Sequence, residues 1–357
     1  MKTRKVRYLR SSVSFLKLLV ASGAATTAHA QSSVLLYGLL DAGIQYKTNT
    51  TAQGSSSWTS SSANASYPSR FGLKGSEDLG GGYRAIFQLE NGFQLNSGAL
   101  ASSDTLFNRM AYVGFSSEKL GSVTFGRQYS VQYDKTVFYE PTLFNNYSIF
   151  SLNIIPPATV RVNNAVKYQS PELHGFNLEA MYSFGQQVPG SFSAGKYWGI
   201  GGEYVTGGFW TRVVYEQVNG TLSAGLDQSG KVDRRTSIAA RYIFDPFSVY
   251  AGVVTVRGSL QASPNGNIYW AAGQYMPNPF LKLIVEGGRY VFKENGGRPT
   301  LLSASALYWL SKSTTVYLTG GYFINGGGSS FGVTNYTTTP SAGMTQLGVA
   351  AGLIKRF

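Results

Sequence analysis

Short segments of alternating polarity recur along the chain from residue 33 onward, and they constrain the fold more than any other feature. A period of two places successive side chains on opposite faces of a sheet, so each segment predicts a strand with one apolar face. We count sixteen such segments. They lie near residues 33–47, 68–76, 82–94, 107–117, 122–130, 161–169, 176–185, 196–206, 209–219, 232–244, 246–258, 267–276, 280–292, 300–310, 314–324 and 342–357.

The breaks between these segments alternate between short and long. The short breaks carry the Gly, Pro, Asn and Asp residues that tight turns need, as at 78–81, 118–121, 171–175, 207–208, 245–246 and 278–279. The long breaks are rich in Ser, Thr, Asn and Gly, as at 48–67, 95–106, 186–195 and 325–341. This rhythm is typical of transmembrane barrels, in which short periplasmic turns alternate with longer extracellular loops.

The composition favours an all-β membrane protein over a helical one. No stretch after residue 30 approaches the ~18 continuous apolar residues of a membrane helix. Yet the chain is 43% hydrophobic and contains 24 Tyr, 21 Phe and 43 Gly. We therefore predict a closed, 16-stranded antiparallel transmembrane β-barrel, which pairs every strand N–H and C=O and is wide enough for an aqueous lumen. A soluble β-sandwich is the alternative, because alternation alone does not separate the two folds.

The first 30 residues are predicted to be a secretory signal peptide, and residues 31–357 a single barrel domain. A basic start is followed by an apolar stretch at 15–25 and by the small residues Ala28 and Ala30 at a cleavage site. An amphipathic helix is the alternative for this region. Without residues 1–30 the chain has 24 Lys and Arg against 17 Asp and Glu, a dispersed surplus that does not favour nucleic-acid binding.

The residue types needed for most enzyme and metal chemistry are scarce. There is no cysteine, and the two histidines are His29, in the predicted signal peptide, and His174, in a predicted turn. One turn histidine is a poor basis for nucleophilic catalysis or a histidine metal site. We expect neither an enzyme nor a cofactor, although an outer-membrane hydrolase is a competing interpretation.

The segment Val131–Val160 differs from the strands around it. It carries Pro141, Pro156 and Pro157 and shows no sustained period of 2 or 3.6. A structureless segment of this length inside a domain is usually functional or disordered. We expect it to fold into the barrel and narrow the lumen, with acidic loop residues facing basic wall residues, although an external surface loop is the alternative.

Several motifs resemble the general-diffusion porins of Gram-negative outer membranes, of the beta-proteobacterial type. The resemblance is carried by the mature start Ser32–Gly43, by Ser69–Gly82 with Ala85–Glu90, by Phe107–Gly114, Gly126–Gln128 and Arg161–Tyr168, and by the terminal Lys355–Phe357. It implies a homotrimer of 16-stranded barrels in the cell outer membrane, each with an inward-folded third extracellular loop. It also implies lipopolysaccharide and the barrel-assembly machinery as partners, and diffusion of small hydrophilic solutes and ions.

The resemblance also suggests candidate channel residues. Basic residues of the pore constriction would be Arg70, Lys74, Arg109, Arg161 and, as an anchor or interface residue, Arg127. Asp134 and Glu140 would be the acidic residues of the constriction loop, and Phe357 would match the assembly signal. Clustered Arg and Lys favour anions, so we expect a modest anion preference. A substrate-specific channel and an adhesion barrel that binds through its loops are the alternatives.

Aromatic residues near the strand ends, among them Tyr83, Trp270 and Tyr317, are expected to form the two interfacial girdles of a membrane barrel. A stacked aromatic path for sugars is the sharper alternative. The loop section 138–157 is also more apolar than the resemblance implies.

Overall fold

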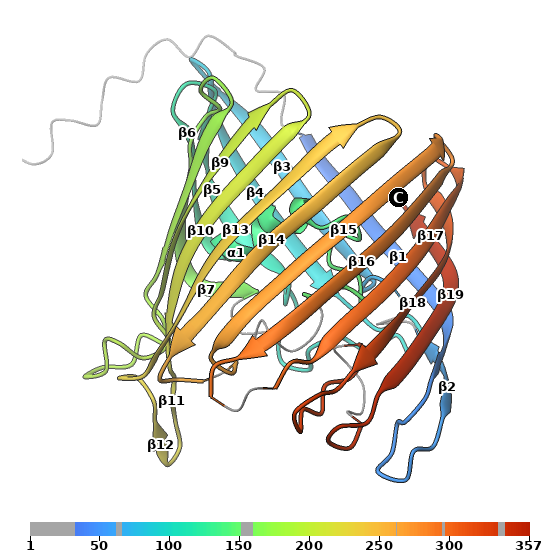
Figure 1. Cartoon of the computed structure of the whole chain (residues 1–357). Helices are drawn as coiled ribbons and strands as arrows, with labels where there is room; N and C mark the ends of the chain where they lie inside the picture. Colours follow the sequence, from blue (N-terminus) through green and yellow to red (C-terminus); the bar gives the residue numbers. More distant parts are fainter. Residues whose placement is uncertain (1–32, 62–65, 151–159, 262, 295–296, 335–339) are drawn as a thin grey trace, which may run out of the picture.

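The computed structural model shows a closed antiparallel barrel of sixteen strands (Figure 1). It describes residues 33–61, 66–150, 160–261, 263–294, 297–334 and 340–357. The predicted signal peptide lies outside these residues. The barrel strands are β1 Ser33–Lys47, β3 Arg70–Gly80, β4 Tyr83–Gly92, β5 Met110–Ser117, β6 Gly121–Tyr129, β7 Arg161–Gln169, β8 Phe176–Ser183, β9 Tyr197–Thr206, β10 Phe209–Asn219, β13 Val232–Phe244, β14 Phe247–Gly258, β15 Gly266–Asn278, β16 Leu281–Phe292, β17 Thr300–Ser311, β18 Thr314–Ile324 and β19 Gln346–Arg356.

The remaining elements are short. Strand β2 (Ser57–Ser61) extends the sheet beside β1, and β11 (Leu222–Ser223) with β12 (Leu226–Asp227) forms a small separate hairpin. Helix α1 (Val131–Thr136) continues into the 3₁₀ turn η1 (Val137–Tyr139). In the described part of the chain, no helix has the length and apolar character needed to span a membrane.

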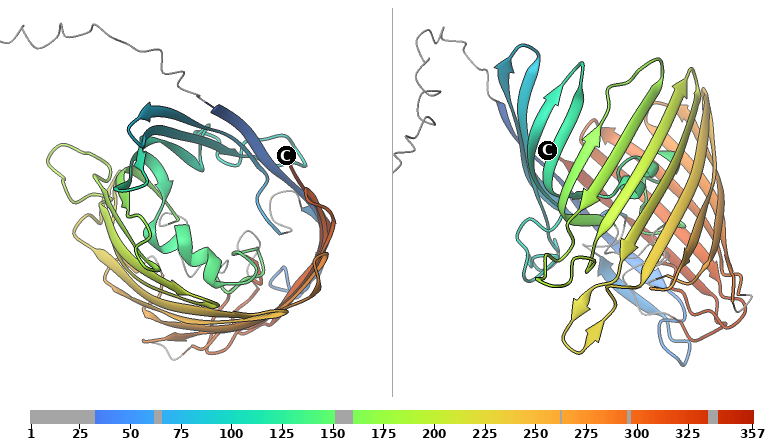
Figure 2. Two further views of the ribbon diagram at one scale, coloured as in Figure 1. Left: turned by 90° about the horizontal axis from the view of Figure 1, so that it is seen from above. Right: turned by 90° about the vertical axis from the view of Figure 1, so that its left-hand side faces the viewer.

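Strand β1 closes the barrel by pairing with the last strand, β19, on one side and with β3 on the other. Its Leu39–Lys47 part pairs with β19, while its Ser33–Leu39 part pairs with β3. The view down the barrel shows the resulting ring (Figure 2). The sixteen-strand prediction is therefore confirmed, with strand ends shifted by a few residues.

The alternation predicted for the last strand is also confirmed. In β19, Leu347, Val349 and Leu353 are exposed on the outside, whereas Gln346 and Ala350 are buried on the inside. An apolar outer face suits contact with lipid, and a polar or small inner face suits a water-filled lumen. The alternation of polarity therefore indicates which side chains of the strand lie on the outer face of the barrel and which lie on the inner face.

The expectation of aromatic girdles holds for some residues and fails for others. Tyr83 is exposed near a turn, but Trp270 and Tyr317 are 4% and 5% exposed and pack in the interior. The reason is the segment after β6, which covers part of the inner wall. A strand-end position alone does not indicate on which side of the wall a side chain lies.

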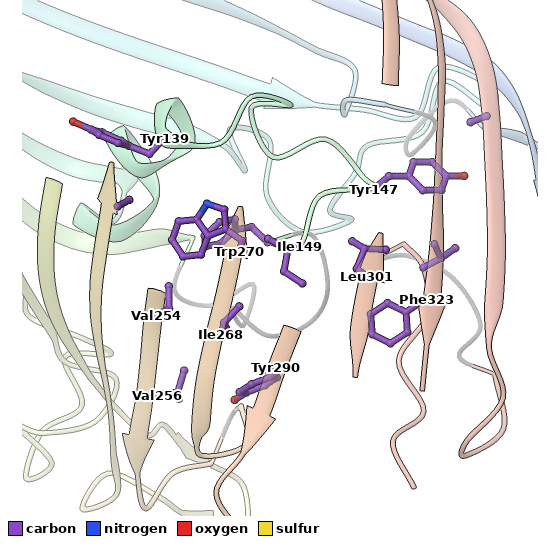
Figure 3. Packing of buried hydrophobic residues seen from close by; sticks show 14 of the residues in the cluster. Tyr139, Tyr147, Ile149, Val254, Val256, Ile268, Trp270, Tyr290, Leu301 and Phe323 are labelled. Atoms are coloured by element: carbon purple, nitrogen blue, oxygen red, sulfur yellow. The ribbon is translucent and has the colours of Figure 1, made fainter. Parts of the chain in front are cut away.

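Side chains of this segment form an apolar cluster with the inner wall (Figure 3). Tyr139, Tyr147 and Ile149 are at most 1% exposed. They share the cluster with wall residues Val254, Val256, Ile268, Trp270, Tyr290, Leu301 and Phe323. Burying each such side chain contributes about 1.5–3 kcal/mol, so the cluster holds the segment against β14–β18.

Wall glycines make room for this packing, which gives a testable expectation. A Cβ at Gly288 would lie 2.5 Å from Cγ1 of Ile149, so Gly288→Ala is expected to displace the segment and destabilise the barrel by about 1–3 kcal/mol. Denaturant unfolding of the refolded protein would measure this. Gly273→Ala is the control, because its Cβ would meet only Val285 at 3.8 Å. Equal stability of the two variants would contradict the packing.

Candidate functional site

Helix α1 is fixed at its first turn by its own cap and by the wall. The Ser130 hydroxyl accepts a hydrogen bond from the backbone N–H of Tyr133 at 3.1 Å. Such a cap satisfies one of the free amides at the start of a helix. From the wall, Arg212 Nη2 donates to the carbonyl of Val131 at 2.9 Å, and the Tyr197 hydroxyl accepts from the Val131 N–H at 3.1 Å. Figure 2 shows the helix within the ring of strands.

A chain of buried ion pairs reinforces this attachment. Lys167 on β7 contacts Asp134 of α1, and its Nζ lies 2.6 Å from Oε1 of Glu179 on β8. The other carboxylate oxygen of Glu179 lies 2.7 Å from Nη2 of Arg212. The side chains of Glu179 and Arg212 are 0% and 1% exposed. Asp134 is thus already neutralised by the wall.

A second group of charges lies around Glu90 on β4. Its Oε1 is 2.6 Å from Nε of Arg109, and its Oε2 is 3.8 Å from Nε of Arg70. Arg109 also donates to the Tyr129 hydroxyl at 2.8 Å, and the Arg161 guanidinium lies 5.0 Å from the centre of the Tyr129 ring. One carboxylate and one tyrosine therefore bring together three arginines from the β3–β7 part of the wall.

These arginines line a cavity of about 660 Å³ inside the barrel. Its charged lining residues are Arg70, Arg109, Asp134, Arg161 and Arg356. The rest of its lining is largely aromatic or aliphatic: Leu39, Tyr67, Pro68, Phe93, Tyr129, Tyr133, Val137, Phe138, Leu143, Phe144, Phe150 and Val160. Four of the proposed channel residues thus lie together.

Lys74 and Arg127 lie apart from this cavity. The ammonium of Lys74 is 5.6 Å from the ring centre of Tyr37, on the strand face that it shares with Arg70. Arg127 donates to the carbonyl of Asn108 at 2.9 Å and to the side chain of Asn163. Its contacts join β6 to the end of the loop before β5 and to β7, which fits an anchoring role.

Glu140 is enclosed by its own turn. Its carboxylate accepts hydrogen bonds from the N–H and hydroxyl of Thr142, both at 2.7 Å, and from the N–H of Phe144 at 2.8 Å. Burial raises the pKa of Glu140, while these hydrogen bonds oppose that rise. The carboxylate therefore organises the turn after η1 and lies outside the lining of the arginine cavity.

Phe357 lies at the barrel seam, where its backbone exchanges hydrogen bonds of 2.9 and 3.2 Å with Gly38. Its side chain is 55% exposed, and a Cβ at Gly38 would lie 2.3 Å from the Phe357 ring. The last residue thus closes the sheet and leaves an aromatic side chain on the surface.

Sequence reasoning missed two partners of the arginines, Glu90 and Tyr129, and a fourth arginine of the cavity, Arg356. Glu90 shares its strand face with Gln88, and that polar parity was the available signal. Which cations reach Glu90 depends on the register of β3, β4 and β5, which the sequence does not state. In the part of the chain that the structure describes, no group of three or more His, Cys, Asp or Glu could hold a metal ion.

The arrangement favours anions on electrostatic grounds. Four arginines line one cavity, and the two carboxylates near them, Glu90 and Asp134, are both in ion pairs. Arg161 and Arg356 make no ion pair within the described residues. A cluster of uncompensated cations in a narrow aqueous passage lowers the energy of an anion and raises that of a cation.

Comparisons with known proteins agree with the fold. A family model described as Gram-negative porin matches residues 18–328. An outer membrane porin of Bordetella pertussis is 30% identical over 247 residues, which are 63% of this chain and 64% of that protein. Outer membrane porin protein 32 of Delftia acidovorans is 28% identical over 383 residues, covering 98% and 100% of the two chains. The alignment with the Bordetella protein thus spans slightly less than two thirds of its length.

Solved structures show the same architecture. The anion-selective porin from Comamonas acidovorans superimposes with a TM-score of 0.78 at 24% identity, over 92% of this chain and 100% of that one. The trimer form of OmpT from Vibrio cholerae superimposes with a TM-score of 0.68 at 16% identity, over 91% and 99%. At these identities, the likeness concerns the fold.

Proposed function

Because the chain belongs to the Gram-negative porin family, we propose that it is an outer-membrane channel for passive diffusion of small hydrophilic solutes and ions. The channel has a modest preference for anions. One observation carries this proposal: four arginines line a single cavity within a closed barrel, and the carboxylates near them are already paired. The names of the relatives, which include outer membrane porins, support the location and the class.

In this proposal, the segment starting at Val131 is the third extracellular loop, folded inward as the constriction. Its support comes from the contacts of α1 with β8, β9 and β10 and from the apolar cluster with β14–β18. The basic wall formed by Arg70, Arg109 and Arg161 lines the same cavity as side chains of α1 and of the turn that follows. An anion would pass along that wall, while the one carboxylate that the cavity lining offers a cation, Asp134, is already paired with Lys167.

We also propose a homotrimer, which is the form named for the OmpT relative. The proposal further includes removal of residues 1–30 as a signal peptide, a barrel domain at 31–357, and recognition of Phe357 by the barrel-assembly machinery. Lipopolysaccharide would surround the outer rim. The exposed apolar outer face of the strands and the exposed Phe357 ring support contacts of these kinds.

Single-channel current across a planar bilayer under a salt gradient tests the proposal. The refolded mature protein is expected to insert with three equal conductance steps and to give a reversal potential of the sign set by anions. A folded, inserted barrel that carries no current would overturn the channel function and would favour adhesion through the loops. A reversal potential at zero or of the cation sign would overturn the anion preference alone.

A further inference from the structure

The cavity combines its arginines with a continuous row of aromatic rings. Tyr129 stacks on Tyr133 with 4.8 Å between ring centres, and Tyr133 meets Phe144 edge to face at 5.5 Å. Phe144 then stacks on Phe150 at 4.4 Å, and Phe150 meets the indole of Trp270 at 4.7 Å. The first four of these residues line the cavity. The row therefore crosses from the arginine wall, along the inserted segment, to the opposite wall.

The row begins at the cationic end of the cavity. Tyr129 accepts a hydrogen bond from Arg109 and lies beneath the guanidinium of Arg161. Arg161 has no ion-pair partner among the described residues, and its Nη2 donates only a long hydrogen bond of 3.5 Å to the Tyr129 hydroxyl. A fork of N–H donors with free capacity matches a carboxylate. An anionic group placed there would have aromatic surface directly beside it.

The described part of the inserted segment, residues 131–150, presents apolar side chains to this space and few charges. Residues 131–160 contain only three charged residues, Asp134, Lys135 and Glu140. Asp134 is paired with Lys167, Lys135 donates to Asn177, and Glu140 is enclosed in its turn. In contrast, Phe138 is 48% and Leu143 42% exposed, although both lie on the inner segment that lines the cavity. Inorganic ions and sugars are hydrophilic, so they gain no favourable contact with this apolar surface.

Resting on the proposed channel function, we propose that the cavity selectively binds and passes organic monocarboxylates with a flat apolar body, such as aromatic carboxylates. The carboxylate lies at Arg161, Arg109 and Arg70, and the ring lies on the partly exposed residues of the row, Tyr129, Tyr133 and Phe144. The cavity volume of about 660 Å³ falls within the range of small-molecule sites. Offset stacking on aromatic side chains recognises a flat ring, and the arginines recognise the charge. A neutral sugar would leave Arg161 without an anionic partner.

Block of the chloride current tests this proposal in the refolded wild-type channel. Benzoate, cyclohexanecarboxylate, acetate and benzyl alcohol are each added at constant ionic strength, and the concentration that halves the current is measured. Benzoate is expected to act at an about tenfold lower concentration than acetate, with cyclohexanecarboxylate between them and benzyl alcohol inactive. Equal values for benzoate and acetate, in a channel that still prefers chloride, would overturn this proposal and leave the proposed function intact. Loss of the chloride preference itself would instead be a failure of the proposed function.

Substitutions in the aromatic row test whether these rings cause the preference for benzoate over acetate. Tyr133→Leu and Phe144→Leu are each expected to reduce the benzoate preference several-fold, whereas Tyr133→Phe keeps the ring and should retain it. Phe192→Leu is the matched control, because Phe192 is 83% exposed in the connection between β8 and β9. An unchanged preference in both leucine variants would contradict the assignment. If a leucine variant fails to fold, the comparison of the four solutes in the wild-type channel still decides the proposal.

Discussion

Replacing Glu179 with glutamine is expected to lower the free energy of unfolding by about 3–5 kcal/mol. The side chain is 0% exposed, and it pairs with Lys167 on one oxygen and Arg212 on the other. Removal of its charge leaves two buried cations with insufficient compensation, which is the costly way to disrupt a buried ion pair. Guanidinium unfolding of the refolded barrel, followed by tryptophan fluorescence, measures the change.

An exposed ion pair provides the matched control for this prediction. Glu118 lies 3.9 Å from Arg84, with side chains 87% and 56% exposed. Glu118→Gln is therefore expected to change the unfolding free energy by less than about 1 kcal/mol. Similar effects of the Glu179 and Glu118 substitutions would contradict the role assigned to the buried chain of charges.

Loss of Glu179 also affects the inserted segment. Arg212 donates to the carbonyl of Val131, and Lys167 holds Asp134, so both cations join the wall to α1. When their shared carboxylate is neutralised, each cation gains freedom to reorient toward water. We therefore expect larger fluctuations of the open-channel current in Glu179→Gln than in the wild-type protein, recorded from the same bilayers.

The barrel was predictable because its determinants are local. Alternation of polarity, as in Leu347 to Leu353, reports on one strand at a time, and turn residues such as Asp245 and Pro246 mark where a strand ends. The predicted and observed strand bounds differ by only a few residues, and the differences occur beside long loops. The strand predicted to start at residue 107 is β5, which starts at Met110. Asn108 belongs to the preceding loop, where its side chain accepts a hydrogen bond from the Gly92 N–H.

The site was predictable only in part, since it depends on pairings between strands. Arg70, Arg109 and Arg161 could be proposed from short motifs, and the structure brings them to one cavity. Their common partner Glu90 and the pair Glu179 with Arg212 could not be predicted, because these contacts depend on barrel register and on how α1 docks. The turn around Glu140 was equally inaccessible: whether a loop carboxylate faces water or its own backbone depends on the fold of the loop.

The double substitution Arg70→Gln with Arg161→Gln is expected to lower the anion-to-cation permeability ratio at least about fivefold. A monovalent ion 5 Å from a guanidinium gains or loses about 0.8 kcal/mol at the dielectric constant of water. The sign is opposite for anions and cations, so both contributions enter the ratio, and screening at 0.1 M salt reduces them by less than half. The reversal potential under a salt gradient should therefore shift toward zero.

These two arginines are suitable because their removal leaves the surrounding structure paired. Glu90 keeps its 2.6 Å contact with Arg109, and Arg161 has no ion-pair partner among the described residues. The control is Arg234→Gln, since Arg234 is exposed on β13, bonds Gln217 and lies outside the cavity lining. Both variants lose positive charge, but only the double variant loses it beside the path of the ions. A double variant that conducts with the wild-type reversal potential would place the selectivity elsewhere, because the cavity charge would then have no effect on permeation.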